Sequence, residues 1–337
     1  MPMSISVILC THNPQPACLR RTLDALCGQT LPYDRWELLF VDNASKDSLA
    51  DKWDISWHPH GRHLQEHEIG LTAARLRGIR ESTGELLVFV DDDNVLDPHY
   101  LELSAAIPAR YPWLGVFGCG ALEPEFQVPP SPELVSRLAL LALRTVPSPV
   151  WSNNTKDYDH LPWGAGLCVS RRVSSVYQEL LARLKVTDVL DRRGRQLTCG
   201  GDDLFSWAAL RDGKGFGLFP ELRLTHLISE GRLNRRYFLR LIGDSAFSHG
   251  VLNYMLTGTE PRQGLSAPQC VRLLLHGIKN GAFSMRCEWA AVKGRTRAAR
   301  FVSENGLRPI EHPPQPSTQP ICEIPGLILE GSNPLKL

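Results

Sequence analysis

Short apolar runs alternate with polar turns over the first 95 residues of the chain. Residues 5–10, 36–41 and 86–90 are mostly apolar, which is typical of strands buried on both faces. Between them, residues 17–27 and 72–81 carry apolar side chains at helical spacing. Strands that alternate with helices predict βαβ units, and therefore an α/β fold with a mostly parallel central sheet flanked by helices.

The middle of the chain is less regular, and it contains many prolines. We expect further elements there in chain order: a strand at 116–121, a helix at 133–144 in an excursion or lid beside the site, a turn and strand at 163–169, a helix at 203–211, and extended segments at 217–220 and 222–227. Polar clusters follow the strands that end near residues 10, 41 and 90. In parallel sheets ligands bind outside the carboxyl ends of the strands, so we expect these clusters to meet at one edge.

The composition shifts near residue 231. Residues 231–310 hold 13 Lys and Arg against 4 Asp and Glu, with apolar residues at helical spacing. Residues 311–337 contain six prolines, which indicates a mostly irregular tail. We therefore predict a first domain at 1–230, a basic helical region at 231–310 and the tail at 311–337.

Overall composition limits the class of protein. The 337 residues include 37 Lys and Arg against 36 Asp and Glu, so we expect no nucleic-acid partner. Nine scattered cysteines form no CxxC pair, which argues against a zinc ribbon or a disulfide framework. No signal peptide and no apolar stretch of spanning length is evident. These features predict a reduced, cytoplasmic protein.

The clearest sign of a functional site is a run of three acids, Asp91, Asp92 and Asp93, directly after a predicted buried strand. Three adjacent carboxylates repel one another unless a cation neutralises them, and Mg²⁺ or Mn²⁺ prefers oxygen ligands. The alternative is a solvated turn that caps the next helix. Asp42 occupies the matching position after another strand, where it suits either a ribose contact or a turn.

Two acids and a histidine complete the candidate chemistry. Asp202 and Asp203 precede a helical segment, where they suit either a helix start or a general base that deprotonates an acceptor hydroxyl. His226 lies in an extended segment, and is either a partly buried core residue or a metal ligand.

Six motifs, in this order along the chain, resemble family 2 glycosyltransferases of the GT-A (Rossmann-like) fold. They are SVILCTHN at 6–13, VDNASKD at 41–47, GLTAARLRGIRESTG at 70–84, FVDDDN at 89–94, WGAGLCV at 163–169 and GDDLFSWAAL at 201–210. The resemblance covers about residues 4–230.

The resemblance implies an inverting hexosyltransferase with a nucleotide-sugar donor, UDP being favoured, and a divalent metal, Mn²⁺ or Mg²⁺. It implies these site residues: Thr11, Asn13, Asp42, Arg75, Asp91 and Asp92 for the donor, Asp91, Asp93 and His226 for the metal, and Trp163 and Gly164 on the acceptor side. The family usually has Glu-Asp where this chain has Asp202-Asp203. The second acid is the usual base, which favours Asp203 and leaves Asp202 as the reserve.

Two other functions remain open at this stage. One is a sugar nucleotidyltransferase, although residues 8–21 lack the glycine that its phosphate loop needs. The other is an inactive module that binds a carbohydrate or a partner. For the enzyme we expect a carbohydrate or lipid-linked acceptor in polysaccharide or cell-surface glycan synthesis. The basic region at 231–310 then suits either peripheral contact with the inner membrane face or packing on the first domain. The sequence leaves the sugar, the nucleotide base, the acceptor and the oligomeric state undetermined.

Overall fold

The computed structural model describes residues 4–310, apart from 155–156, 185–188 and 195. The predicted irregular tail at 311–337 lies outside the described residues. Within them, no helix has both the length and the apolar character needed to cross a membrane.

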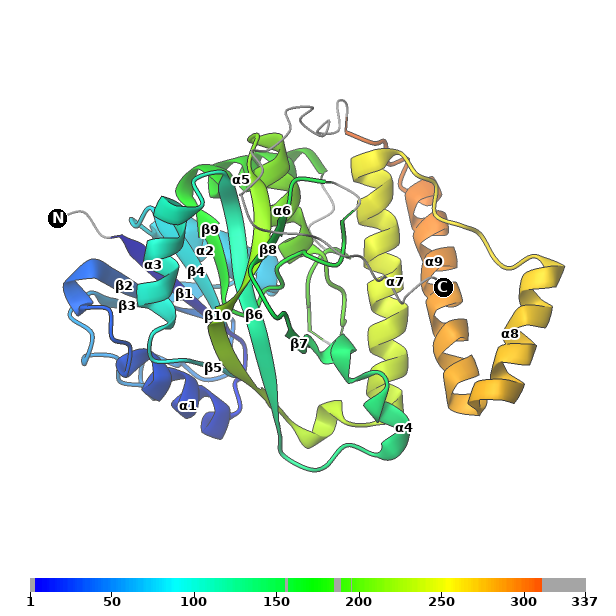
Figure 1. Ribbon diagram of the computed structural model, residues 1–337, viewed down its shortest axis with the longest axis horizontal. Coiled ribbons are helices and arrows are strands. Elements are labelled where there is room, and N and C mark those ends of the chain that lie inside the picture. The colour runs from blue at the N-terminus through cyan, green and yellow to red at the C-terminus, as the bar shows by residue number, and fades with distance from the viewer. Residues whose placement is uncertain (1–3, 155–156, 185–188, 195, 311–337) are drawn as a thin grey trace.

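A single mixed sheet forms the centre of the molecule (Figure 1). Its main path runs β3-β2-β1-β4-β9-β6-β10-β5, while β7 pairs with β6 and β8 pairs with β10. The strands are β1 (Ile5–Thr11), β2 (Trp36–Asn43), β3 (Gly61–Glu66), β4 (Leu86–Asp91), β5 (Asn94–Leu96), β6 (Leu114–Phe126), β7 (Arg144–Thr145), β8 (Val150–Ser152), β9 (Leu167–Ser170) and β10 (Gly215–Ile228).

The predicted parallel order holds for the first half of the sheet. Strands β3, β2, β1 and β4 are all parallel neighbours. The second half is mixed: β9 runs antiparallel to both β4 and β6, β10 is parallel to β6, and β5 is antiparallel to β10. The three predicted strands of the first half are confirmed, and the predicted strand at 116–121 is the centre of the longer β6.

Helices cover both faces of this sheet. The α-helices are α1 (Pro16–Cys27), α2 (Leu71–Glu81), α3 (Tyr100–Arg110), α4 (Pro132–Val135), α5 (Arg171–Leu184), α6 (Gly201–Arg211), α7 (Arg235–Thr257), α8 (Ala267–Asn280) and α9 (Ala282–Glu304). Helices α1 and α3 pack on one face, and α2, α5 and α6 pack on the other.

The two hydrophobic cores, one on each face of the sheet, receive alternate side chains of the strands. In β1, Ile8 joins the core beneath α2, α5 and α6, whereas Val7 and Leu9 join the core beneath α1 and α3. Because successive side chains point to opposite faces, a strand that is apolar throughout contributes to both cores. Helix α2 lies very close to β1 at Gly78, where an added Cβ would stand 2.3 Å from Ile8 Cγ2.

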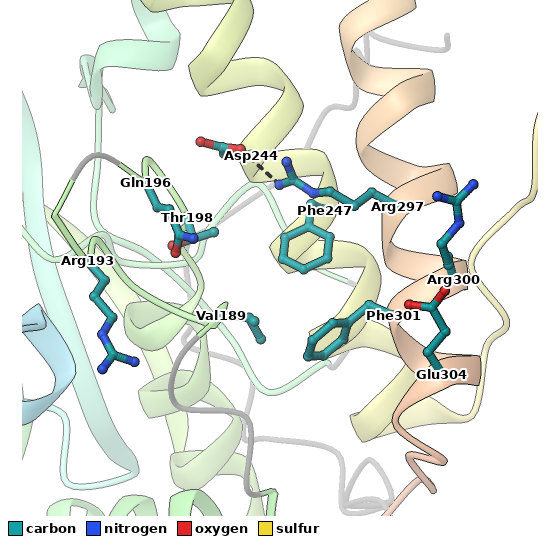
Figure 2. Close-up of a pocket in the computed structure, with 10 residues that line it drawn as sticks. All are labelled: Val189, Arg193, Gln196, Thr198, Asp244, Phe247, Arg297, Arg300, Phe301 and Glu304. Carbon is teal, nitrogen blue, oxygen red and sulfur yellow. Dashed lines mark hydrogen bonds and ion pairs between the residues drawn. The ribbon is translucent and has the colours of Figure 1, made fainter.

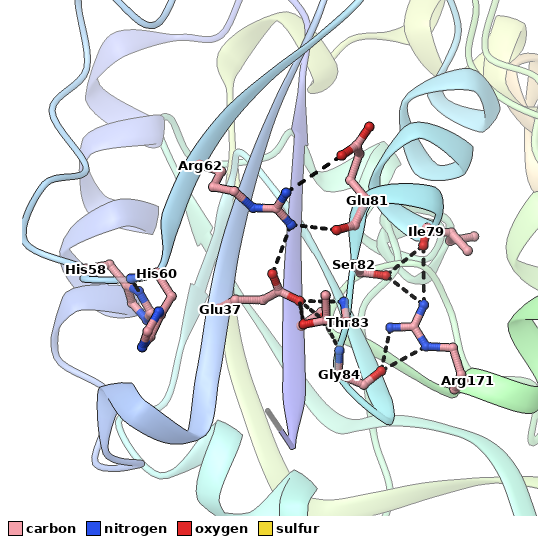
Figure 3. Close-up of polar contacts among 11 residues, drawn as sticks. Glu37, His58, His60, Arg62, Ile79, Glu81, Ser82, Thr83, Gly84 and Arg171 are labelled. Carbon is pink, nitrogen blue, oxygen red and sulfur yellow. Dashed lines mark hydrogen bonds and ion pairs between the residues drawn. The ribbon is translucent and has the colours of Figure 1, made fainter. Parts of the chain in front are cut away.

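Glu37 is a buried acid within β2, and it joins three segments (Figure 3). Its Oε1 accepts hydrogen bonds from the Ser6 hydroxyl at 2.7 Å and from the Thr83 backbone and hydroxyl at 2.6 and 2.7 Å. Its Oε2 pairs with Arg62 Nη2 at 3.0 Å. The carboxylate therefore ties the turn before β4 to β1 and β3, which fixes the strands that carry the candidate site.

Helices α7, α8 and α9 occupy the predicted basic helical region (Figure 1). Helix α7 is part of the main core, because Val251, Leu252 and Met255 pack in the same cluster as α5 and α6. Helix α8 contacts α9 and lies at the edge of the molecule, away from the sheet. The division of the chain at residue 230 stays a prediction.

The predicted helix at 133–144 is wrong. The segment forms only α4 and a 3-10 helix, η2 (Leu138–Leu141), before Arg144 enters β7. Ala142 adopts a left-handed conformation with φ of 57°, which stops the helix before Arg144 pairs with Leu122 of β6. Leu134 and Leu141 pack against Phe238 of α7, so buried contacts outweigh the helical pattern.

Candidate active site

The predicted polar clusters lie together at one edge of the sheet. Thr11 is in register with Asp42 across β1 and β2, and Cys10 is in register with Asp91 across β1 and β4. The Thr11 hydroxyl donates a hydrogen bond to Asp92 Oδ2. Burial and the charges of Asp93 and Asp91 raise the pKa of Asp92 to about 7, although the Thr11 bond opposes this.

Asp42 and Asn13 shape the turns beside this edge. The two carboxylate oxygens of Asp42 accept backbone N–H groups, from Ser45 at 3.0 Å and from Leu49 at 3.4 Å. The Asn13 side chain accepts the Lys46 N–H at 3.0 Å, with Asn13 itself at φ of 49°. Asp42 thus has the turn role that the sequence left open, and it is 7% exposed.

Arg232 joins two of the three predicted metal ligands. Its Nη1 lies 2.9 Å from Asp93 Oδ2 and 3.0 Å from His226 Nε2, and the Asp93 and His226 atoms are 3.4 Å apart. Burial would raise the pKa of Asp93, but the bond and charge of His226, with the charges of Arg232 and Arg192, lower it to about 2. Arg232 belongs to the 3-10 helix η4 (Glu230–Arg232).

The metal prediction is only partly matched by this arrangement. Asp93 and His226 are an oxygen and nitrogen pair of suitable chemistry. A guanidinium nevertheless contacts both, and it supplies the positive charge that a cation would bring. Across the described residues, no group of three or more His, Cys, Asp and Glu side chains is placed to hold a metal ion. The residues as placed do not fit a metal, and we derive no step through one.

Arg75 of α2 is buried beside the start of α6. Its Nη1 lies 3.5 Å from Asp191 Oδ2, an atom that also accepts the Thr72 hydroxyl at 2.8 Å. Asp191 Oδ1 accepts the backbone N–H of Gly201 at 3.2 Å. The charges of Asp91 and Asp202 also act on Arg75. One guanidinium is therefore shared by the sheet edge and the first turn of α6.

Asp202 faces the segment before β9. Its Oδ2 accepts the backbone N–H of Gly164 at 3.0 Å. An added Cβ on Gly164 would stand 2.3 Å from Arg75 Nη2, so glycine allows this close approach. Burial, and next the charge of Asp203, raise the pKa of Asp202 to about 6.

Asp203 points toward α7. Its Oδ2 lies 2.9 Å from Nε2 of His249. On the other side, the Arg144 guanidinium lies over the Trp163 ring, 3.2 Å from its centroid, and the charges of Asp202 and Asp203 act on it. Burial lowers the pKa of Arg144 to about 10. The acidic pair thus lies among an aromatic ring, two arginines and a histidine.

The chain matches proteins of one family over its first third. Residues 6–106 match the model of glycosyl transferase family 2. The glycosyltransferase AglE of Haloferax volcanii is 32% identical over 98 residues, which cover 28% of this chain and 31% of that protein. The uncharacterized glycosyltransferase YwdF of Bacillus subtilis is 32% identical over 104 residues, covering 31% of this chain and 37% of that protein.

The match assigns residues 6–106 of this chain, rather than its whole length, to glycosyl transferase family 2. The family region contains β1 to β5 and Thr11, Asp42, Arg75 and the three aspartates. The matches span about a third of each of these two relatives, so they concern that region alone. The fold extends further: the mannosyltransferase PcManGT of Pyrobaculum calidifontis, solved with GDP-Man and Mn²⁺, aligns over 90% of this chain and 77% of its own, with a TM-score of 0.51 and 20% identity.

Four residues near the site were missed from the sequence. They are Arg144, Asp191, Arg232 and His249, and each makes a contact at the candidate site with a residue more than 40 positions away in the chain or with an aromatic ring beside the acids of α6. Arg144 fell inside the helix predicted for 133–144. The others lie in stretches with no recognisable motif, and only the surplus of arginine after residue 231 gave a signal.

A pocket lies close to the candidate active site but is separate from it (Figure 2). It is formed by the segment around Val189 to Thr198 together with α7 and α9, and Phe247 and Phe301 supply its apolar wall. Arg297 crosses it to pair with Asp244 at 2.9 Å. None of the predicted site residues is among those that line it.

Proposed function

We propose that this protein transfers a sugar from a nucleotide-diphosphate donor to an acceptor hydroxyl, with inversion at the anomeric carbon. The observation that supports the proposal most strongly is the position of the Arg75 side chain. Its guanidinium is within electrostatic reach of Asp91 at the sheet edge and of Asp202 at the start of α6. A donor diphosphate at this edge would therefore lie beside both a buried cation and the acids of α6.

The residues take distinct roles in this proposal. Thr11, Asn13 and Asp42 border the nucleoside, and Asp91 and Asp92 lie toward the ribose and diphosphate. Arg75 offsets charge that develops on the leaving diphosphate. Trp163 and Gly164 line the acceptor side. Much of the rate then comes from holding donor and acceptor in a reactive geometry.

Asp203 is the proposed base, with Asp202 as the reserve. Two features support this order. Asp202 Oδ2 accepts the Gly164 N–H, and its pKa is raised to about 6, so part of its population is protonated near neutrality. Among the described residues, Asp203 has no such backbone partner for its Oδ2, which instead lies 2.9 Å from Nε2 of His249.

Metal assistance through Asp91, Asp93 and His226 stays a prediction. The solved Pyrobaculum mannosyltransferase contains Mn²⁺. In this chain Arg232 would have to leave Asp93 and His226 before a cation bound there. Metal binding and Arg232 binding are therefore mutually exclusive at these two side chains.

Nucleotide titration tests the donor proposal. UDP, GDP and dTDP are titrated calorimetrically into the full chain, first with Mn²⁺ and then with excess chelator. We expect one nucleotide to bind best, and UDP is favoured. An Arg75→Gln variant should lose most of this affinity, while Arg77→Gln, half-buried on the same helix and paired with Glu81, is the matched control. Folded protein that binds none of the three nucleotides would contradict the proposal.

The acceptor is proposed to be a carbohydrate or a lipid-linked glycan used in polysaccharide or cell-surface glycan synthesis. Helix α8 supports the membrane part of this proposal. Val271, Leu274, Leu275 and Ile278 recur at helical spacing, yet they are 56–82% exposed. Arg272 and Lys279 are exposed on the same helix. An apolar stripe with basic neighbours is typical of helices that lie in an anionic membrane surface.

The two alternative functions would give different results in an activity assay. A sugar nucleotidyltransferase would release pyrophosphate from a nucleoside triphosphate and a sugar phosphate. An inactive binding module would bind a glycan without turnover of any labelled donor. The acids at 91–93 and 202–203 favour transfer over a binding module, which has no need for a base beside a buried arginine. The lack of glycine in residues 8–21 counts against the nucleotidyltransferase.

A further inference from the structure

Helix α7, from the C-terminal helical region, brings a histidine to the first turn of α6. His249 Nε2 lies 2.9 Å from Asp203 Oδ2. The side chain of Asp203 is 14% exposed and that of His249 is 54% exposed. The carboxylate is therefore mostly buried and its imidazole partner half-exposed, and the partner belongs to an element that the family region at 6–106 does not include.

Packing fixes α7 against the segment that precedes α6. The Ser248 hydroxyl accepts the backbone N–H of Cys199 at 3.1 Å, and Asp244 Oδ2 accepts that of Leu197 at 3.0 Å. Leu252 approaches Gly200, whose added Cβ would stand 3.2 Å from Leu252 Cδ2. His249 is thus presented by a helix that is anchored on both sides of the contact, rather than by a loop.

Several ionisable groups surround the pair. The Cys199 thiol lies 3.7 Å from His249 Nε2, the Tyr158 hydroxyl is within electrostatic reach of both members, and the charge of Asp203 acts on Arg144. Burial alone would lower the pKa of His249, but Cys199 and Asp203 raise it well above its ordinary value. The surroundings thus favour an imidazole that donates from Nε2 to the carboxylate.

We propose that His249 is a positioning residue for the base. Its Nε2–H holds Asp203 Oδ2 and turns the carboxylate so that Oδ1 takes the acceptor proton. In this step the acceptor O–H bond breaks and its proton goes to Oδ1, while the oxygen forms a bond to the anomeric carbon. The bond from that carbon to the diphosphate breaks, and its electron pair leaves on the diphosphate. The inference rests on the proposed function.

Kinetics of full-length variants test this role. His249→Ala should lower kcat about 10- to 100-fold, the scale expected when a catalytic group is misplaced, with the KM for donor unchanged. Because the variant lacks the titratable imidazole beside the base, the pH profile of kcat should also differ from that of the wild type. His249→Gln keeps an N–H donor and should recover much of kcat. Arg236→Gln, exposed on the same helix, is the control and should behave as wild type.

A second measurement does not need transfer. The imidazole of His249 is titrated by NMR in the wild type and in Asp203→Asn, where loss of the negative charge should lower the pKa of His249. An unchanged pKa of His249, or a wild-type kcat and pH profile in His249→Ala, would overturn the role of His249. Absence of transfer by the wild type with every donor would instead contradict the proposed function, so the two failures are distinguishable.

Discussion

Arg75 and Asp191 form an ion pair in the interior, with Nη1 3.5 Å from Oδ2 and side chains only 3% and 7% exposed. The two residues come from α2 and from the segment before α6, 116 positions apart. Because Asp191 also accepts the Thr72 hydroxyl and the Gly201 N–H, it fixes α2 against the first turn of α6. The pair thereby sets the distance between the sheet edge and the proposed base.

Loss of Asp191 should be strongly destabilising. Asp191→Ala leaves the buried Arg75 charge without this partner, and breaking a buried pair from one side costs about 3–5 kcal/mol. We expect that fall in the free energy of unfolding, measured by urea denaturation. Asp47→Ala, which removes the exposed pair with Lys52, is the control and should change little. Equal stability of the two variants would contradict a structural role for the buried pair.

Glu37 should make stability depend on acid pH. Burial alone would raise its pKa, but hydrogen bonds from Ser6, Thr83 and Arg62 outweigh burial and lower it from the ordinary value of 4.5. A lowered pKa in the folded state means that the contribution is present above the unfolded value and is lost as pH falls through the folded value. Urea midpoints from pH 7 down to pH 3 should fall more steeply for wild type than for Glu37→Gln. Parallel curves would contradict this account.

The first half of the sheet could be predicted because its strands are apolar throughout. Such runs contribute side chains to the cores on both faces of the sheet, and the turns after them are polar. The alternation of strand, turn and helix can therefore be recognised in the sequence. The strand expected within 163–169 and the extended segments expected at 217–220 and 222–227 are confirmed as β9 and β10. The antiparallel direction of β9 could not be predicted, since pairing direction depends on tertiary contacts rather than on local pattern. The helix predicted for 133–144 failed for the same reason: Arg144 pairs in β7, and Leu134 packs on α7.

The candidate site could be predicted only where a residue follows a strand or lies in a family motif. Thr11 and Asp42 met in register as expected, and Arg75 lies beside the acids of α6. Asp191 and His249 could not be found, because neither has a local pattern and each depends on a contact made through the fold. Arg232 was missed although His226, its partner, was singled out.

Arg232 should compete with a divalent cation. Arg232→Gln removes one positive charge from Asp93 and His226, so Mn²⁺ alone should bind at least about fivefold more tightly, the effect of a unit charge about 4 Å away in water. Free Mn²⁺ is followed by electron paramagnetic resonance. Arg235→Gln, which loses the pair with Glu133 and the contact with the Phe283 ring but touches neither Asp93 nor His226, is the control. The double variant with Asp93→Asn should lose the gain. Unchanged Mn²⁺ affinity in Arg232→Gln would refute the competition.

Helix α8 should determine membrane binding. Leu275→Glu and Ile278→Glu place charge in its exposed apolar stripe, and sedimentation with anionic vesicles should fall sharply while the fold stays intact. Glu288→Gln on α9 is the control and should sediment as wild type. Vesicles without anionic lipid should bind less of every variant. Wild-type chain that never sediments with anionic vesicles, or that forms a dimer through α8, would contradict the membrane proposal.

Donor turnover in the wild type and in Asp203→Asn tests the central claim most directly. Labelled UDP-sugars, with GDP- and dTDP-sugars beside them, are incubated with a panel of glycan acceptors, and nucleotide affinity is measured on the same samples. The account predicts transfer by the wild type, and loss of transfer in Asp203→Asn with nucleotide binding nearly intact. Normal transfer by Asp203→Asn would contradict the assignment of the base, and nucleotide binding without any turnover by the wild type would contradict the proposed activity.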